Sequence, residues 1–250
     1  TKRPRTRGGR RNTGVSVFAM ADAKWQQAGQ SGLYLKPVRA DQKTGQFLGL
    51  VRVDAGCSTG LHQHLDVATS LFLGGSLADY TGAVGQGWVG INVHGDTHDA
   101  ISYDGCVLAS RLDGPVIYAP DGGKVHGLHT GAKKAAFEPV PADRQPDINI
   151  DMMAQRAVPL PFAGVSRRML FDYAATPHDR RMVCLQFQPG AALPAHVSDF
   201  PIEYFVVAGD LQVSGQTAAT NSFAIAEPGT GIELASSYGC LALAWADGPS

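Results

Sequence analysis

The sequence has little charge and no long hydrophobic run. Of its 250 residues, 17% are Asp, Glu, Lys or Arg, and the formal net charge is −1. This balance provides no general attraction to nucleic acid or to a membrane surface, so we expect neither as a partner. No apolar run approaches the roughly 18–20 residues of a membrane-spanning helix. The N-terminus is basic, but no apolar segment follows it as in a secretory signal.

Cysteine is also scarce, and its spacing does not suggest metal binding or disulfides. The chain has four cysteines and no C-x-x-C pair. They are Cys57, Cys106, Cys184 and Cys240. Such spacing fits buried thiols in a reducing compartment better than a disulfide framework, and we therefore expect a cytoplasmic protein.

Helical periodicity is weak throughout, whereas turn residues are abundant. Thirty glycines and fifteen prolines separate many short β-rich runs. This pattern predicts an all-β fold. The length suits one large domain or two domains of ordinary size.

An internal repeat decides between these possibilities. An offset of 134 residues aligns the two halves without a gap and places Gly190 on Gly56 and His196 on His62. The same offset pairs Gly75 with Gly209, Leu77 with Leu211, Gly95 with Gly229, Gly105 with Gly239 and Cys106 with Cys240. Glycines that recur in register indicate the same turns. The sequence therefore predicts a duplication and two tandem jelly-roll β-barrels.

The boundaries follow from composition. The segment Pro141 to Pro146 is polar and contains two prolines, so we place the linker there. The expected organisation is a basic arm over residues 1–14, a first barrel over residues 15–140 and a second over residues 141–250. The arm has six basic residues, which indicate either a segment that binds an acidic partner or a solvated tail.

The strongest chemical signal is the pair His62 and His64. Side chains two residues apart lie on the same face of a β-strand, so both imidazoles can reach one metal ion. His98 is the best third ligand, because Gly95 predicts a turn three residues before it. Three histidines leave coordination positions open, as in catalytic metal sites.

These residues resemble the two conserved motifs of the cupin superfamily. The first motif, G-x5-H-x-H-x3-4-E-x6-G, is represented by Gly56, His62, His64 and Gly75, with Ala68 or Thr69 where the glutamate belongs. The second, G-x5-P-x-G-x2-H, is represented by Gly87, Gly95 and His98, with Val93 in place of proline. The resemblance extends from about Trp25 to Trp245 and implies a bicupin, of which only the first barrel keeps a metal site.

Further segments resemble two branches of this superfamily. Leu73 to Tyr80, with Gly82 and Gly105-Cys106, is similar to ChrR-type anti-sigma-factor cupins and to the 2,4′-dihydroxyacetophenone and acetylacetone dioxygenases. Gly114 to Tyr118 is similar to the acetophenone dioxygenase branch. Anti-sigma cupins keep the glutamate and bind zinc, whereas these dioxygenases have three-histidine iron sites. The absent glutamate therefore favours the second branch.

The dioxygenase resemblance implies an enzyme that uses Fe(II) and O2 to cleave a C–C bond of a small diketone or hydroxyketone. Zn, Mn or Ni are the other metals we consider. Three neutral imidazoles leave the charge of a divalent ion uncompensated, which favours an anionic chelating substrate.

Two other functions stay open, namely a non-catalytic regulatory cupin related to anti-sigma factors and a metal-dependent isomerase or hydrolase. Only about 25 residues of this sequence precede the start of the cupin resemblance at Trp25, which we expect to be too few for a helical partner-binding domain, and this favours an enzyme. A homodimer is possible.

Several other polar residues are weaker candidates. Thr69, Tyr103 and Arg111 could donate hydrogen bonds in the first pocket, or simply pack or face solvent. His126 and His129 follow a loop signature and could form a lid, supply a fourth ligand or lie in a surface loop. In the second barrel Ser198 and Ile232 replace two of the histidines, which predicts a degenerate site. The alternative is a divergent second site formed by His196, Glu203 and Glu233.

Overall fold

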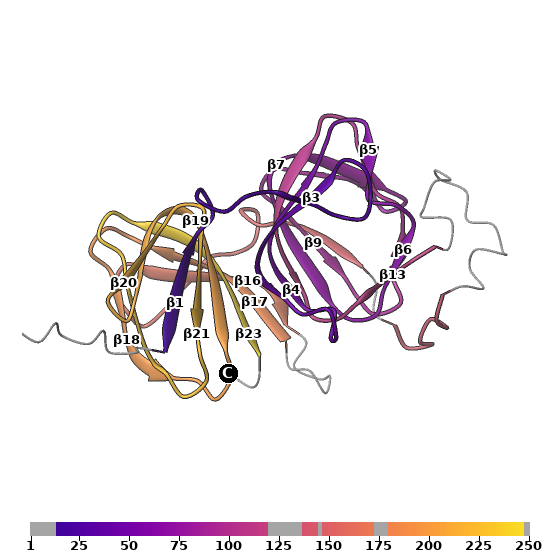
Figure 1. Cartoon of the computed structure of the whole chain (residues 1–250). Coiled ribbons are helices and arrows are strands. Elements are labelled where there is room, and N and C mark those ends of the chain that lie inside the picture. Colours follow the sequence, from indigo (N-terminus) through magenta and orange to yellow (C-terminus); the bar gives the residue numbers. More distant parts are fainter. Residues whose placement is uncertain (1–13, 120–136, 145–146, 173–179, 248–250) are drawn as a thin grey trace, which may run out of the picture. The chain divides into compact units, whose positions relative to one another are not determined.

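The computed structural model describes residues 14–119, 137–144, 147–172 and 180–247. All regular elements among them are β-strands, and they form two sets of antiparallel sheets, one in each barrel (Figure 1). The prediction of an all-β chain with two tandem jelly-roll barrels is confirmed.

The first barrel is built on a large sheet with the strand order β14-β9-β7-β12-β4-β3-β2. These strands are β2 (Gln26–Gln27), β3 (Leu33–Ala40), β4 (Phe47–Val53), β7 (Ala68–Asp79), β9 (Trp88–Asn92), β12 (Cys106–Leu112) and β14 (Ile148–Asp151). Three short strands extend it: β5 (Cys57–Ser58), β8 (Gly82–Gly85) and β11 (Ile101–Ser102). A separate three-stranded sheet consists of β10 (Thr97–His98), β6 (His62–His64) and β13 (Val116–Tyr118).

The second barrel repeats this plan, with the order β1-β21-β19-β23-β17-β16-β15. These strands are β1 (Val15–Ala19), β15 (Val158–Pro159), β16 (Val165–Asp172), β17 (Arg180–Phe187), β19 (Ile202–Val213), β21 (Ser222–Ala226) and β23 (Cys240–Asp247). The strands β18 (Ala192–Val197), β20 (Gln216–Ala219) and β22 (Gly231–Ala235) complete it. The strands β7, β8 and β9 begin and end at the offset of 134 from β19, β20 and β21.

The recurring glycines form the same turns in both barrels. Gly75 and Gly209 have backbone φ angles of 70° and 81°, in the left-handed region that favours glycine. A Cβ atom on Gly75 would overlap the carbonyl oxygen of Gly105, and one on Gly209 would overlap that of Gly239. The repeated glycines therefore mark close backbone contacts that no larger residue could make.

The barrel boundaries differ from the expected ones because one strand at each barrel comes from outside its expected range. Strand β14, at residues 148–151, pairs with β9 of the first barrel. Strand β1, at residues 15–19, pairs with β21 of the second barrel (Figure 1). The compact units are accordingly 1–17, 159–166 and 172–250 for the second barrel, and 18–158 and 167–171 for the first. The expected linker thus precedes a strand of the first barrel.

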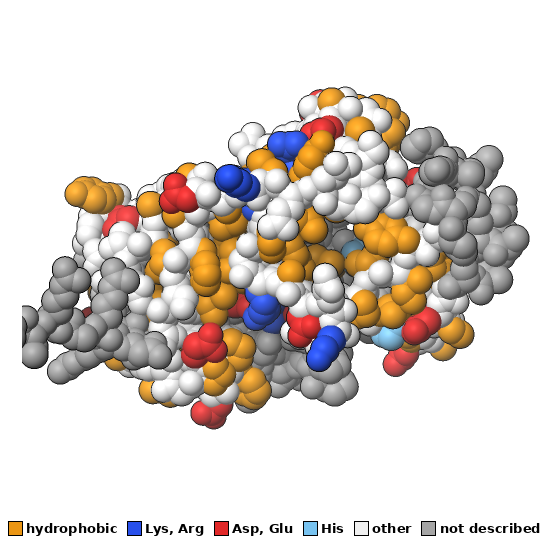
Figure 2. All heavy atoms as spheres, in the orientation of Figure 1, with side chains coloured by type: hydrophobic (Ala, Val, Ile, Leu, Met, Phe, Trp, Pro, Cys, Tyr) orange, Lys and Arg blue, Asp and Glu red, His pale blue; other side chains and the backbone are white. Residues whose placement is uncertain are grey.

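Charged side chains of both signs are spread over the face drawn in Figure 2, among apolar and neutral atoms. Among the described residues, no helix is long and apolar enough to cross a membrane. Residues 1–13 of the expected basic arm lie outside the described part of the chain. The same holds for His126 and His129.

Candidate metal centre

The three predicted histidines lie side by side because of strand pairing. Strand β6 presents His62 and His64 on one face, and β10 pairs with β6 so that His98 lies directly opposite His62. Gln63, between them, points to the other side. Its side-chain amide donates to the Glu138 carbonyl (3.0 Å) and accepts from the Glu138 N–H (2.9 Å). These bonds fix the strand that presents the histidines.

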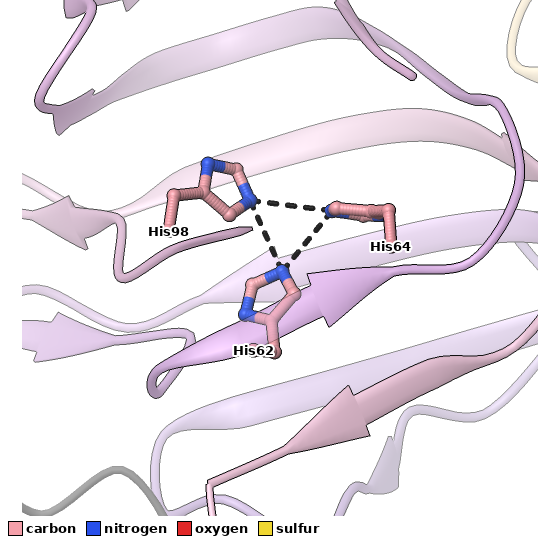
Figure 3. Close-up of side chains that lie close together, drawn as sticks. All are labelled: His62, His64 and His98. Atoms are coloured by element: carbon pink, nitrogen blue, oxygen red, sulfur yellow. Dashed lines mark hydrogen bonds between the residues drawn. The ribbon is translucent and has the colours of Figure 1, made fainter. Parts of the chain in front are cut away.

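The three imidazoles point their Nε2 atoms at one another (Figure 3). The distances are 3.2 Å from His62 to His64, 3.2 Å from His64 to His98 and 3.1 Å from His98 to His62. The centre of such a triangle is nearer to each corner than the ~2.0–2.1 Å of a zinc–imidazole bond. All three nitrogens can therefore bind one ion, and the three side chains are at most 8% exposed.

Hydrogen bonds at the opposite ring nitrogens orient two of the imidazoles. His62 Nδ1 lies 2.6 Å from the Gly60 carbonyl oxygen, and His98 Nδ1 lies 2.8 Å from Asp79 Oδ2. An Nδ1–H that donates to each oxygen leaves the Nε2 lone pair available to a metal. The chemistry of the donor set therefore fits a divalent metal ion bound by neutral imidazoles.

Burial and charge have different effects within the triad. Burial, followed by the charge of His98, lowers the pKa of His62 to about 3. Burial, His62 and His98 lower the pKa of His64 well below its ordinary value. Burial alone would lower the pKa of His98 too, but the hydrogen bond to Asp79 and the charges of Asp96, Asp79 and Asp147 raise it. His62 and His64 are thus neutral across the physiological range.

Asp79, the partner of His98, is not revealed by the sequence, because a β-bulge changes the alternation of strand β7. Phe72 pairs with Leu108 but Gly74 pairs with Val107, so Leu73 is an extra residue. Before the bulge Ala68, Ser70 and Phe72 face the barrel interior, and after it Leu77 and Asp79 do. The only signal in the sequence would have been the bulge itself.

A wider polar network surrounds His98. Asp96, which is 1% exposed, accepts hydrogen bonds from the Tyr80 hydroxyl (2.9 Å) and the Asn92 amide (2.8 Å). Arg144 pairs with Asp96 at 3.4 Å and also with Asp147. Burial, followed by the charge of Asp96, raises the pKa of the Tyr80 phenol, which keeps it a donor. The carboxylates near His98 therefore have partners both on strand β9 and in the turns around it.

The triad opens onto a cavity of about 460 Å³ inside the first barrel. The apolar lining includes Leu35, Phe47, Val51, Phe72, Leu108 and Leu112, and the polar lining includes Thr59, Ser70, Asn92, Ser110 and Asn149. Ala68, at the position of the cupin glutamate, also lines the cavity. Its methyl group leaves space where a carboxylate would otherwise lie.

The other predicted pocket residues do not line this cavity. Thr69 and Arg111 are buried but alternate with the lining residues of β7 and β12, so they face the other side of the sheet, where Arg111 pairs with Asp113 at 3.1 Å. Tyr103 is 72% exposed in the turn before β12. Of the two alternatives for these residues, the structure therefore shows packing for Thr69 and Arg111 and solvent exposure for Tyr103, rather than positions in the pocket.

The structure does not bring His196, Glu203 and Glu233 together in the second barrel. His196 and Glu233 are exposed, and Glu203 is 1% exposed on β19. His196 pairs with Ile232 of β22. Glu233 is the next residue after Ile232, so its side chain lies on the opposite face of β22. Among the described residues, the only group of three or more His, Cys, Asp or Glu side chains close enough to share an ion is His62, His64 and His98.

The interior of the second barrel is filled where that of the first is open. At the offset of 134, cavity-lining residues of the first barrel correspond to core residues of the second. The pairs are Ser70 and Tyr204, Asp79 and Val213, Gly90 and Ala224, Asn92 and Ala226, His98 and Ile232, and Ser110 and Ala244. The two copies share a backbone plan, but within the described residues the group of three histidines beside a cavity lies in the first.

Comparison with known proteins agrees with this architecture. Residues 13–114 match the family model described as the ChrR cupin-like domain. The fold is that of a bicupin. A search of curated protein sequences gave no match.

Three solved structures illustrate the likeness of fold. A dioxygenase candidate from Nostoc punctiforme PCC 73102 has a TM-score of 0.70 at 10% identity, covering 93% of this chain and 82% of that one. A variant of Bacillus subtilis oxalate decarboxylase has a TM-score of 0.63 at 14% identity, covering 94% and 78%. The Escherichia coli pirin YhhW, in complex with nickel(II), has a TM-score of 0.62 at 13% identity, covering 94% and 100%. At these identities the likeness shows the fold alone.

Proposed function

We propose that the chain is a non-haem Fe(II) dioxygenase that cleaves a C–C bond of a small diketone or hydroxyketone. The observation that carries the proposal is the triangle of Nε2 atoms of His62, His64 and His98 with Ala68 in place of a carboxylate. The similarity in fold to the Nostoc dioxygenase candidate and to a pirin that binds nickel(II) is consistent with a metal-dependent oxygenase.

The donor set favours an anionic chelating ligand. Three neutral imidazoles contribute no negative charge, so a bound divalent ion would keep its full charge until the substrate arrives. An enolate or an ionised hydroxyketone would supply this charge through two oxygens. When bound, Fe(II) would hold these oxygens and supply the electron density needed to reduce O2.

The protein groups perform the remaining tasks. Asp79 and the Gly60 carbonyl hold His98 and His62 with their Nε2 atoms toward the cavity. The apolar walls exclude water from the reacting oxygens. For a β-diketone, the reaction adds one O2 and breaks the bond between a carbonyl carbon and the central carbon. Both oxygen atoms end in the two products, a carboxylic acid and an α-ketoaldehyde, so no other reductant is required.

The direct test is O2 consumption by Fe(II)-loaded protein with a panel of β-diketones and hydroxyacetophenones. We expect consumption of one O2 per substrate with at least one compound, and none with the His64→Ala variant. Metal analysis of protein purified without air should find iron.

A second function is favoured by the family match to the ChrR cupin-like domain over residues 13–114. In this alternative the chain is a non-catalytic cupin that binds zinc and regulates a partner protein. Zinc as the native metal, together with no turnover of any compound in the panel, would favour this alternative over the dioxygenase. Turnover with zinc, manganese or nickel but without O2 would instead indicate an isomerase or a hydrolase.

A further inference from the structure

A pair of serines forms a second polar group on the wall of the first-barrel cavity. Ser70 of β7 and Ser110 of β12 are direct partners in the antiparallel register, and their Oγ atoms lie 2.8 Å apart. Both side chains line the cavity, and Ser110 is 2% exposed. The next inward-facing residues on the two strands are apolar: Phe72 follows Ser70 on β7, and Leu108 precedes Ser110 on β12.

The serine pair, Ser70 and Ser110, has hydrogen-bonding capacity beyond its mutual bond. Two hydroxyls carry two protons and four lone pairs, and one bond between them uses one proton and one lone pair. Two amides of the wall are already engaged by residues outside it. Asn92 donates to Asp96, and Asn149 donates to Thr81. The serine pair can therefore form further hydrogen bonds with a polar group in the cavity.

The second barrel shows that this fold does not need hydroxyls here. At the offset of 134, Tyr204 and Ala244 replace the serine pair. Both belong to the closed apolar core of that barrel, and Tyr204 is 1% exposed. Strands β19 and β23 pair in the same register around them, with Tyr204 opposite Ala244. The hydroxyls occur where the cavity is open, as expected of groups that contact a ligand.

The charge of the wall restricts what the serine pair can bind. Among the described residues that line the cavity there is no lysine or arginine, and the only carboxylate is Asp79, which is bound to His98. A second anionic group on a ligand would lose its hydration without gaining a cation. A neutral hydroxyl or carbonyl group needs only the hydrogen bonds that the two serines offer.

We propose that Ser70 and Ser110 form a subsite that binds a neutral hydroxyl or carbonyl group of the ligand, separate from the oxygens held at the three histidines. Resting on the function proposed above, this describes the substrate as a chelating ketone with an apolar body and one additional neutral polar group. Dicarboxylates and phosphorylated compounds are excluded from the class.

The test compares two ligands that differ by one hydroxyl: 1-phenylbutane-1,3-dione and its 4-hydroxyphenyl analogue. Their dissociation constants are measured by calorimetry without oxygen, on protein carrying the metal with which it was purified. We expect the hydroxylated diketone to bind about fivefold more tightly, as one net neutral hydrogen bond allows. In Ser70→Ala/Ser110→Ala the two affinities should become equal through loss on the hydroxylated compound alone.

Two further variants make the result specific. Ser102→Ala removes a buried hydroxyl of the same barrel that bonds to the Ser76 carbonyl outside the cavity, and it should keep the preference. Ser70→Tyr/Ser110→Ala copies the second barrel, and it should lose both ligands while keeping its metal.

An unchanged preference in Ser70→Ala/Ser110→Ala, or no binding of either diketone to the unaltered protein, would overturn the subsite. Because binding is measured without oxygen, a preference that depends on the serine pair would stand even if no oxygen-dependent cleavage occurred. Conversely, cleavage with an unchanged preference would refute the subsite alone.

Discussion

Asp79 Oδ2 lies 2.8 Å from His98 Nδ1, on the side of the imidazole away from His62 and His64. Burial alone would raise the pKa of this carboxyl, but the hydrogen bonds from His98 and Thr81 lower it, so it is ionised beside the ring. A carboxylate in this position fixes the tautomer of a metal-binding histidine and increases its basicity.

Replacing Asp79 with asparagine should therefore weaken metal binding about 10–100-fold, the usual effect of losing such a partner. Competition with a chelating dye would measure the affinity. Asp104→Asn is the matched control, because Asp104 bonds to Ser76 and lies outside the triad. Equal affinities in Asp79→Asn and the unaltered protein would show that His98 needs no carboxylate partner.

The two barrels should respond differently to loss of corresponding histidines. His64→Ala removes one corner of the nitrogen triangle and should abolish tight metal binding. His196→Ala, at the position that corresponds to His62, alters an exposed side chain and should leave the metal content unchanged. Metal analysis after dialysis decides, and an equal loss in both variants would mean that the second barrel also binds metal.

Two glycines with similar backbone angles should differ in their tolerance of alanine. Gly56 and Gly75 have φ angles of 74° and 70°, but a Cβ atom on Gly56 meets open space. Gly56→Ala should cost about 1–2 kcal/mol of stability from left-handed strain alone. Gly75→Ala must also displace the Gly105 carbonyl, so its melting temperature should fall clearly further in calorimetry. Similar losses would show that the backbone near Gly105 yields easily.

A pH-dependent contribution to stability is expected at Asp210 in the second barrel. Burial would raise the pKa of this carboxyl, but hydrogen bonds from the Ser237 and Tyr238 N–H groups and the Ser236 hydroxyl lower it. A folded pKa below the unfolded value of about 3.9 stabilises the fold above that pH. The contribution is lost as the pH falls through the folded pKa.

Asp210→Asn should therefore lower stability by about 1–2 kcal/mol near pH 7, since hydrogen bonds to a charged acceptor are weakened. The difference from the unaltered protein should shrink below about pH 4. Melting temperatures at pH 7 and pH 3 measure this, and a difference that is the same at both pH values would contradict it. Asp199→Asn, an exposed residue of the same barrel, serves as the control.

Much of the fold and the triad could be predicted because both depend on local rules. Glycines that recur at the offset of 134 predict the turns of both barrels. The spacing of His62 and His64 predicts that both side chains lie on the same face of one strand. Asp79 could not be found in this way, since the extra residue Leu73 reverses the alternation of its strand. The sequence left open whether Thr69 and Arg111 line the pocket, because this depends on which face of the sheet each residue occupies. The metal and the substrate stay predictions.

Two pairings, that of β1 with β21 and that of β14 with β9, have a consequence for any attempt to produce the two barrels as separate proteins. A cut at residue 140 gives an N-terminal piece that lacks the edge partner of β9 and still carries residues 15–19, whose partner β21 is on the other piece. Each piece alone would expose an unpaired strand edge, which promotes aggregation. When both pieces are produced together, they can restore both strand pairings. The two barrels should therefore be expressed and engineered as one chain.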